Sequence, residues 1–479
     1  MTSSFVATIG LEIHVQLDTQ TKMFCRCRRT VDAPPNSHVC PVCLGMPGGL
    51  PVVNQGAVAM GVQLAEALSC TIHRQSVFAR KNYFYPDLPK GYQITQHEAP
   101  LATDGVLADP ETGEVVRVSR VHLEEDAGKS IHPQSGEHSL VDFNRCGAPL
   151  AEIVTEPEFH SPGAAVAWLK ELWTLVDFLG ICRGSMADGV FRCDANVSMA
   201  KVGCGELGVR TELKNMNSFQ AILSALEFEI DRQTEVLRTG GRVLLETRLW
   251  DEGTGQTLVM RGKEEARDYR YFDEPDLPVL ILEPMWLQRV VESTRETPGE
   301  VRRAFAHRFG LTREDVGRFT TSRKWADYAF EALERAQDIP AVCNWLNRDV
   351  ANAIHQSGGD PSALSVAPDD ISKLANLVES GTLSLPMARN VFRTMWSRVL
   401  PLAQCLEDAG HQESDESTLR TVVGELIDEF PDEARRYVAG KESLLRWFVG
   451  QAMRRTQGRG NPQIISQLFE KLLNRKEHP

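Results

Sequence analysis

Acidic, imidazole and cationic side chains recur at every second position in short stretches of this chain. In 6–17 and 191–199 apolar residues alternate with polar ones, and 209–214 repeats the pattern; 116–126 alternates less regularly and ends in carboxylates. Alternate residues of a strand share one face. The polar positions include Glu12, His14, Glu124, Glu125, Arg192, Asp194, Arg210, Glu212 and Lys214. Carboxylates suit a hard cation and Arg and Lys suit phosphate oxygens, so the pattern predicts magnesium-assisted phosphoryl transfer.

The alternative is the solvated face of an ordinary sheet. For any one of these stretches taken alone, that explanation is the better one. A solvated face has no physical need for so much acid and base on short strands. Three regular cases and one weaker case together favour a common site.

Length, composition and charge limit the classes of protein to which this chain can belong. The chain has 479 residues, 42% of them hydrophobic and 24% charged, which is ordinary for a globular protein of about three domains. No apolar run or N-terminal signal predicts a membrane span or secretion, and 11 cysteines without such a signal predict reduced thiols in the cytoplasm. From 435 to the end there are ten Lys or Arg against three Asp or Glu, so this tail carries +7 and the remainder −20 of the net −13. Any polyanion should therefore bind at the tail.

The organisation changes near Trp286. Before it, short strands are interrupted by two predicted helices, 161–180 and one from about 218 to 240. After it, helical periodicity dominates, as in 325–336 and 340–354. The pattern predicts an α+β fold followed by helices.

Two cysteine pairs form the most specific local motif. Cys25 and Cys27 precede Cys40 and Cys43, and four closely spaced thiolates suit tetrahedral Zn²⁺. Four thiolates leave no open position for a substrate, so such a zinc would be structural. Four unliganded cysteines remain the alternative.

Two further segments combine cations with aromatic or glycine residues. In 80–87, Arg80 and Lys81 stand beside Tyr83 and Tyr85, which fits either stacking on a base with phosphate contacts or an aromatic core strand with a basic flank. In the tail, the Gly-rich turn 450–462 could approach a sugar-phosphate backbone, although many basic turns bind nothing. Its candidate contacts are Arg454, Arg455, Arg459 and Asn461.

Taken in order, these motifs resemble the B subunits of the glutamyl-tRNA(Gln)/aspartyl-tRNA(Asn) amidotransferases. The resemblance covers nearly the full chain. It rests on the segments 9–14, 25–43, 80–87, 122–130, 142–145, 192–196, 212–215, 268–272 and the turn ending in Asn461 and Pro462.

The resemblance implies a fold, an activity and three domains. Residues 1–292 would form a cradle with a mainly antiparallel sheet of the glutamine synthetase and guanido kinase type, including the zinc-binding loop 25–43. A helical domain, 293–406, and a basic tRNA-binding tail domain, 407–479, would follow. The cradle would use ATP to phosphorylate the side-chain carboxylate of Glu or Asp misacylated on tRNA, and ammonia would then replace phosphate.

The resemblance also implies roles for individual residues. His14, Glu125 and Glu212 would ligate Mg²⁺, with Glu124 and Asp194 as near neighbours, while Glu12 would hold a second metal or the attacking ammonia. Arg192, Arg210 and Lys214 would neutralise phosphate charge. The residues that would contact ATP or the aminoacyl end of the tRNA are Arg80, Lys81, Tyr83, Tyr85 and Lys129.

Ammonia would come from partner proteins. The chain has no Gly-Ser-Ser-Gly-Gly amidase segment, so the resemblance implies a glutaminase A subunit and a small C subunit in a heterotrimer. Two other classes remain open: a zinc-stabilised RNA-binding protein without activity, and an amidoligase for a small free acid. The first leaves the acidic strands without a purpose, and the second leaves the basic tail without one.

Overall fold

The stretches of alternating residues lie together in a nine-stranded sheet. In this computed structural model, which describes residues 5–29, 33–131, 133, 138–260, 269–409, 415–456 and 458–475, they form β1 (Phe5–Gln16), β7 (Val115–Glu125), β11 (Phe191–Lys201) and β12 (Thr211–Lys214). The strand order is β14-β13-β12-β11-β1-β10-β7-β6-β2. The other strands are β2 (Thr71–Ile72), β6 (Ala102–Ala108), β10 (Pro149–Thr155), β13 (Glu246–Asp251) and β14 (Gln256–Val259). Only β12 and β13 run parallel among these neighbours, so the expected α+β fold with a mainly antiparallel sheet is confirmed.

The register of the central strands determines which side chains meet. On β1, Glu12 is opposite Asp194 of β11, while His14 is opposite Arg192 on one side and Glu152 of β10 on the other. Directly opposed residues project to the same face of an antiparallel sheet. One face of the central strands therefore collects ionisable groups from segments more than 100 residues apart.

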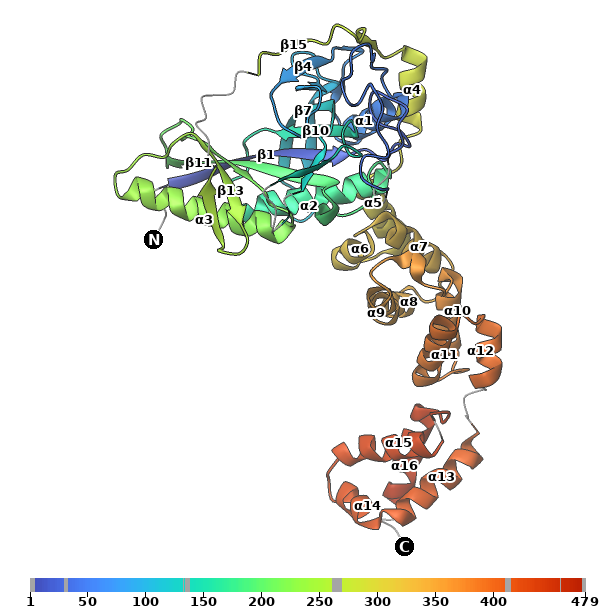
Figure 1. Cartoon of the computed structure of the whole chain (residues 1–479). Coiled ribbons are helices and arrows are strands. Elements are labelled where there is room, and N and C mark those ends of the chain that lie inside the picture. Colours follow the sequence, from blue (N-terminus) through green and yellow to red (C-terminus); the bar gives the residue numbers. More distant parts are fainter. Residues whose placement is uncertain are drawn as a thin grey trace. The chain divides into compact units, whose positions relative to one another are not determined.

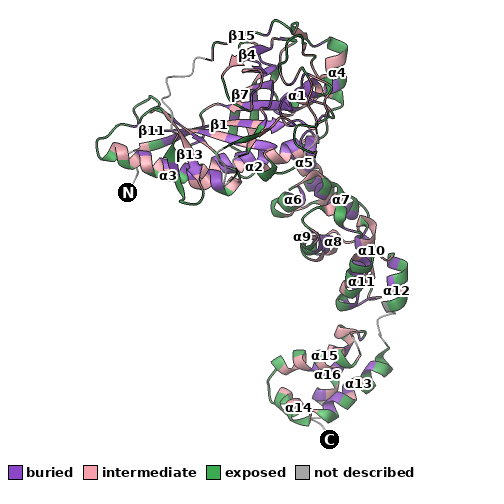
Figure 2. Ribbon diagram, viewed as in Figure 1, coloured by how far each residue is buried: buried purple, intermediate pink, exposed green. Residues whose placement is uncertain are grey.

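The opposite face is apolar and is covered by helices. The odd residues Ile9, Leu11 and Ile13 of β1 are buried, and α1 (Gln55–Ala67), α2 (Pro162–Leu179) and α3 (Phe219–Arg238) pack on this side (Figures 1 and 2). The hydroxyl of Ser161 accepts a hydrogen bond from the Ala164 amide at the start of α2, and Gly180 ends it at φ 69°. Both predicted helices are confirmed.

A small sheet borders the polar face. It contains β4 (Ala79–Asn82), β5 (Tyr92–Thr95) and β15 (Phe272–Asp273). The Thr95 hydroxyl donates to Glu124 Oε2 at 3.1 Å, and the side-chain amide of Gln93 donates to the Glu125 backbone carbonyl at 2.8 Å, so β5 is fixed against the end of β7. Short pairs β3 (Gln75–Ser76) with β16 (Leu280–Ile281), and β8 (Lys129–Ile131) with β9 (Leu140–Asp142), complete the strands described, and α4 (Pro284–Glu292) follows them.

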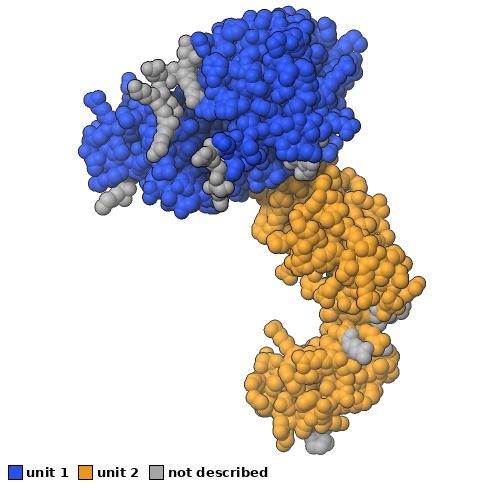
Figure 3. All heavy atoms as spheres, viewed as in Figure 1, with its two compact units in different colours: residues 1–299 blue, residues 300–479 orange. Residues whose placement is uncertain are grey.

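The chain divides into two compact units, Met1–Gly299 and Glu300–Pro479 (Figure 3). The second unit is helical in its described residues, with α5 (Pro298–Phe309) starting at the boundary. The predicted helix 340–354 is divided: α8 (Ile339–Trp345) passes through a π-helical segment, Leu346–Val350, into α9 (Ala351–Gln356). The other helices are α6 (Arg313–Phe319), α7 (Arg323–Glu334), α10 (Pro368–Glu379), α11 (Leu385–Arg398), α12 (Leu402–Ala409), α13 (Glu416–Glu429), α14 (Pro431–Val438), α15 (Ser443–Arg455) and α16 (Pro462–Arg475).

The last four helices have a hydrophobic core of their own. Leu419 and Val423 of α13 pack with Phe448 of α15 and with Ile465 and Phe469 of α16. The further division of the second unit at residue 406 stays a prediction. Across the described ranges, no helix combines the length and hydropathy needed to cross a bilayer.

Candidate active site

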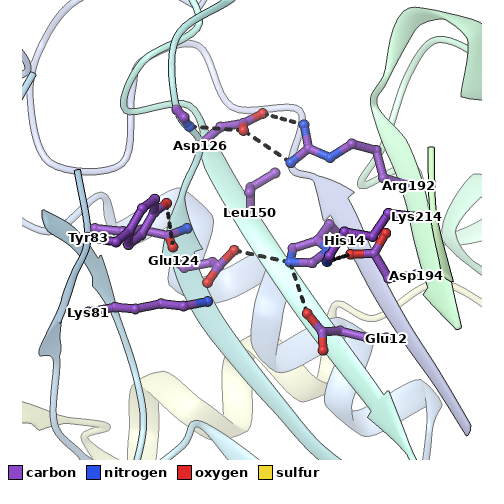
Figure 4. Close-up of a pocket in the computed structure, with 12 residues that line it drawn as sticks. Glu12, His14, Lys81, Tyr83, Glu124, Asp126, Leu150, Arg192, Asp194 and Lys214 are labelled. Atoms are coloured by element: carbon purple, nitrogen blue, oxygen red, sulfur yellow. Dashed lines mark hydrogen bonds and ion pairs between the residues drawn. The ribbon is translucent and has the colours of Figure 1, made fainter. Parts of the chain in front are cut away.

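A cluster of carboxylates and imidazoles occupies the polar face of the central strands. The Nε2 atom of His14 lies 3.2 Å from Glu152 Oε2, 3.4 Å from Glu124 Oε1 and 3.9 Å from Glu12 Oε1. The same oxygen of Glu152 lies 3.3 Å from Nε2 of His122. Figure 4 shows Glu12 and Glu124 reaching His14 from two sides. Strands β1, β7 and β10 are neighbours, and this adjacency brings the five side chains together.

Burial makes these charges strongly interdependent. Glu124 and Glu152 are 2% and 5% exposed. Burial by itself would lower the pKa of His14, but the hydrogen bond to Glu152 and the surrounding carboxylates outweigh it and raise the pKa to about 9. Burial likewise opposes charge on His122, yet Glu152 and Glu124 raise its pKa to about 9. In the absence of a metal, protons on the imidazoles thus balance the carboxylates.

Cationic side chains surround this cluster. Lys214 pairs with Asp194 and lies 2.9 Å from Glu212 Oε1. Arg192 donates to both oxygens of Asp126, at 2.9 and 3.1 Å. Burial opposes the charge on Lys214, but Asp194 and Glu212 raise its pKa above the usual range.

Lys81 enters from the small sheet. Its Nζ lies 5.0 Å from the centre of the Tyr269 ring. Burial would lower the pKa of Lys81, but Glu124 and its neighbours raise it. The ammonium group is therefore held charged beside the acidic cluster (Figure 4).

These groups line a hollow of about 260 Å³. That volume is below the range of roughly 300–1,000 Å³ typical of sites for drug-sized ligands. A space of this size accommodates a phosphoryl group and a short acidic side chain. The lining residues are Glu12, His14, Lys81, Tyr83, Gln93, Glu124, Asp126, Ala127, Leu150, Arg192, Asp194 and Lys214.

The donor set fits a divalent cation. One ligand atom each from Glu12, His14 and Glu152 lies within 4.8 Å of the others. Carboxylate oxygens are the ligands that Mg²⁺ prefers, and the buried cluster carries more acid than base when both imidazoles are neutral. A cation at this place would replace the imidazole protons as the balancing charge.

The cysteine cluster fits zinc. The sulfur atoms of Cys25, Cys27, Cys40 and Cys43 all lie within 4.8 Å of one another, and those of Cys40 and Cys43 are 3.9 Å apart. Zn–S bonds of about 2.3 Å in a tetrahedron place neighbouring sulfurs about 3.8 Å apart. None of the four is in a disulfide.

Two expected ligands lie outside the hollow. Glu125 points to the opposite side of β7 from Glu124; it pairs with Lys90 and accepts a hydrogen bond from the Ile94 amide at 3.0 Å. Glu212 lies one strand beyond Asp194 and accepts a hydrogen bond from the Thr247 hydroxyl at 2.8 Å. We therefore leave Glu125 out of the ligand set and keep Glu212 as a partner of Lys214.

Four other residues that were expected to contact phosphate, ATP or the aminoacyl end of the tRNA also lie outside the hollow. Arg80 makes two hydrogen bonds to Glu274, at 2.7 and 2.8 Å, and so fastens β4 to the segment after β15. Arg210 is exposed and precedes β12. Tyr85 and Lys129 are exposed and do not line the hollow.

Three residues of the site, His122, Asp126 and Glu152, received no role from the sequence patterns. Glu152 is the single ionisable residue of β10, a strand that is otherwise largely buried and apolar, whereas His122 stands among several ionisable residues of β7. The isolation of Glu152 was a usable signal, because a lone carboxylate in a buried strand needs a partner. Asp126 directly follows Glu124 and Glu125, the two predicted ligands at the end of β7.

The tail residues differ in their surroundings. Arg455 on α15 pairs with Glu429, at 2.6 Å, and with Glu425, at 3.6 Å. Asn461 caps α16 by accepting from the Gln463 amide at 3.0 Å. Arg454 and Arg459 are exposed.

Fold and site together define a class of protein: a mainly antiparallel sheet whose polar face carries a buried cluster of carboxylates and imidazoles beside cationic side chains. Family models narrow this class. Residues 7–288 match the GatB/GatE catalytic domain and residues 327–473 match the GatB domain. The chain belongs to this family, the B subunits of tRNA-dependent amidotransferases. Asp268, the first residue of one motif behind the expected resemblance, lies outside the described residues.

Curated relatives extend the similarity over the whole chain. The B subunit of the aspartyl/glutamyl-tRNA(Asn/Gln) amidotransferase from Geobacter sulfurreducens is 44% identical over 476 residues, covering 98% of this chain and 99% of that protein. The B subunits of the same enzyme from Geotalea daltonii and Thermodesulfovibrio yellowstonii are 44% and 42% identical over 473 and 472 residues, covering 98% of this chain and 99% of each.

Proposed function

We propose that this chain amidates the side-chain carboxylate of Glu or Asp misacylated on tRNA(Gln) or tRNA(Asn), using ATP and ammonia in the cytoplasm. The observation that carries the proposal is the cluster of Glu12, His14, Glu124 and Glu152 beside three cations on one face of the sheet. The tRNA substrate is supported by family membership and by the basic tail.

A carboxylate must be activated before ammonia can displace its oxygen. In the first step, a substrate carboxylate oxygen attacks the γ-phosphorus of ATP, the bond to the β-phosphate oxygen breaks, and ADP leaves. In the second, ammonia attacks the acyl carbon and loses a proton, and the bond to phosphate breaks. The products are an amide, ADP and inorganic phosphate.

The side chains in the hollow have separate tasks. Lys81, Lys214 and Arg192 balance the charge of the transferring phosphoryl group. His14, Glu124 and Glu152 are the groups that would hold Mg²⁺, because Glu152 offers a ligand atom close to that of His14 and also close to that of Glu124. When bound, Mg²⁺ would polarise phosphate oxygens. Glu12 is the least buried carboxylate of the cluster, with its side chain 30% exposed. We therefore assign to Glu12 the task of holding ammonia and accepting its proton.

The zinc loop has a structural task. We assign Cys25, Cys27, Cys40 and Cys43 to one Zn²⁺, which would fix the loop without taking part in the reaction. Ammonia comes from a glutaminase A subunit in a heterotrimer with a small C subunit.

The test uses the reconstituted heterotrimer with each misacylated tRNA, ATP and Mg²⁺. With glutamine or ammonium chloride as nitrogen donor, we expect Gln-tRNA(Gln) or Asn-tRNA(Asn) and one ADP per amide. The chain alone should hydrolyse no glutamine. Absence of any ADP formation that depends on misacylated tRNA contradicts the proposal and leaves a non-enzymatic RNA-binding protein, whereas amidation of free Glu or Asp at the same rate would indicate a small-molecule amidoligase.

A further inference from the structure

Lys22 is a completely buried lysine next to the cysteine cluster. Its side chain has no exposed surface, and it stands among the largest fully buried side chains described. Its Nζ lies 3.6 Å from Cys43 Sγ and donates to the Phe143 carbonyl at 3.2 Å. Its stem passes Gly147, where an added Cβ would stand 3.5 Å from Lys22 Cδ.

A buried ammonium group requires a compensating negative charge. Among the described residues, Lys22 forms no ion pair with a carboxylate; its acceptors are a sulfur and a carbonyl. A Cβ added at Gly147 would also stand 3.8 Å from Glu125 Oε2, but that carboxylate is already paired with Lys90. The sulfur of Cys43 is therefore the group that can carry the missing charge.

Zinc bound by four thiolates supplies that charge. Two positive charges on the ion and four negative charges on sulfur leave a net charge of −2 on the cluster, which is costly in a partly buried loop. Hydrogen bonds from outer groups to the ligands stabilise such clusters. We propose that Lys22 is a positioning residue that balances the charge of the zinc–thiolate cluster through Cys43; this rests on the zinc assignment made above.

The second contact of Lys22 connects the zinc loop to the active site. Phe143 lies two residues before Arg145, which donates to the Ala127 carbonyl at 3.1 Å and lies 3.6 Å from the carboxylate of Asp126. Asp126 in turn holds Arg192 at the hollow. Lys22 thus fastens the thiolate cluster to the turn that supports the phosphate-binding side of the site.

The test measures zinc retention in the full chain. Zinc per chain is determined by elemental analysis, and its release to a colorimetric chelator is followed in the wild type and in Lys22→Met, which keeps the stem and removes the charge. We expect about one zinc per chain in the wild type and release about 10-fold or more faster in Lys22→Met. Lys22→Arg, which keeps a cation, should release zinc more slowly than Lys22→Met.

Lys90→Met is the matched control. The side chain of Lys90 is 6% exposed and packs against Gly45 of the zinc loop, but its ammonium pairs with Glu125 and not with a cysteine. This variant leaves Glu125 and not a thiolate unpaired, so under conditions where circular dichroism shows it folded its zinc release should stay close to that of the wild type. If Lys22→Met does not fold, as judged by circular dichroism, Lys22→Gln replaces it, since it keeps a hydrogen-bond donor without the charge.

The outcomes separate the two assignments. A wild-type chain that binds no zinc, even when refolded with it, overturns the zinc assignment. A wild-type chain that holds zinc, with equal release rates in the wild type and the uncharged variants, overturns the role of Lys22 alone. Equal acceleration in Lys22→Met and Lys90→Met also contradicts it, because packing and not charge would then govern retention.

Discussion

Glu152 faces His14 directly across β10 and β1, with its Oε2 atom 3.2 Å from His14 Nε2. The same oxygen lies 3.3 Å from His122, so one carboxylate holds two imidazoles. Burial would raise the pKa of Glu152, but His122 and His14 lower it well below its usual value. A cation bound by His14 and Glu152 would take the place of the imidazole proton between them.

Replacing Glu152 should therefore remove activity without removing the fold. In Glu152→Gln the side chain keeps its shape but loses the charge that a cation needs. We expect kcat to fall about 100-fold or more, measured as ADP formation by the heterotrimer with saturating misacylated tRNA and ammonium. Glu235→Gln, an exposed residue on α3 paired with Arg238, is the control and should match the wild type. Wild-type activity in Glu152→Gln would show that the cluster does not serve the reaction.

Neighbouring carboxylates on β7 should have different effects when changed. Glu124→Gln removes a group 3.4 Å from His14, so the Mg²⁺ concentration for half-maximal activity should rise about 10-fold or more. Glu125→Gln leaves Lys90 buried without its partner, which costs roughly 3–5 kcal/mol. Denaturant unfolding should show that loss in Glu125→Gln and a smaller one in Glu124→Gln. A larger shift in Mg²⁺ dependence for Glu125→Gln would return that residue to the ligand set.

The alternating pattern was sufficient to predict the face shared by Glu12 and His14. Period-2 alternation in a strand depends only on local sequence, and the helix limits at Ser161 and Gly180 depend on local capping. These predictions are confirmed by β1 and α2.

The pairing between strands could not be predicted from the local sequence in the same way. Glu124 and Glu125 are adjacent in β7, so one of them had to face the site and the other had to face away. Which one faces the site depends on contacts with Lys90 and Thr95, which lie about 30 residues away in the sequence. Glu152 was missed because its strand shows one carboxylate among apolar residues, without the alternation that drew attention to β1. The register of β1, β10 and β7 sets Glu152 opposite His14 and His122, and this pairing cannot be predicted from the local sequence pattern.

The imidazoles should make stability depend on pH when no divalent cation is added. His14 and His122 have pKa values of about 9 in the folded chain against 6.5 ordinarily, so their protonated forms stabilise the fold. This contribution is complete below pH 6.5 and is lost as the pH rises through 9. The melting temperature should fall over that interval by about 3 °C or more.

His122→Gln provides the comparison, because it removes one of the two groups. The pH-dependent fall in its melting temperature should be smaller than in the wild type, and saturating Mg²⁺ should reduce the fall in both. Identical pH profiles for the two proteins would contradict the assignment of the effect to this cluster.

The tail arginines should contribute unequally to tRNA binding. Arg454 and Arg459 are exposed, and the described residues give neither a carboxylate partner, whereas Arg455 is engaged by Glu425 and Glu429. Neutralising a phosphate contact weakens binding and reduces its dependence on salt. The double change Arg454→Ala with Arg459→Ala should weaken binding of the heterotrimer to tRNA about 10-fold at moderate salt. It should also make the negative slope of log affinity against log salt shallower by roughly 1–2. Arg455→Ala should change the slope less, because its positive charge is already balanced within the tail. Filter binding across a salt series measures both quantities, and an unchanged slope in the double variant would exclude these arginines from the tRNA contact.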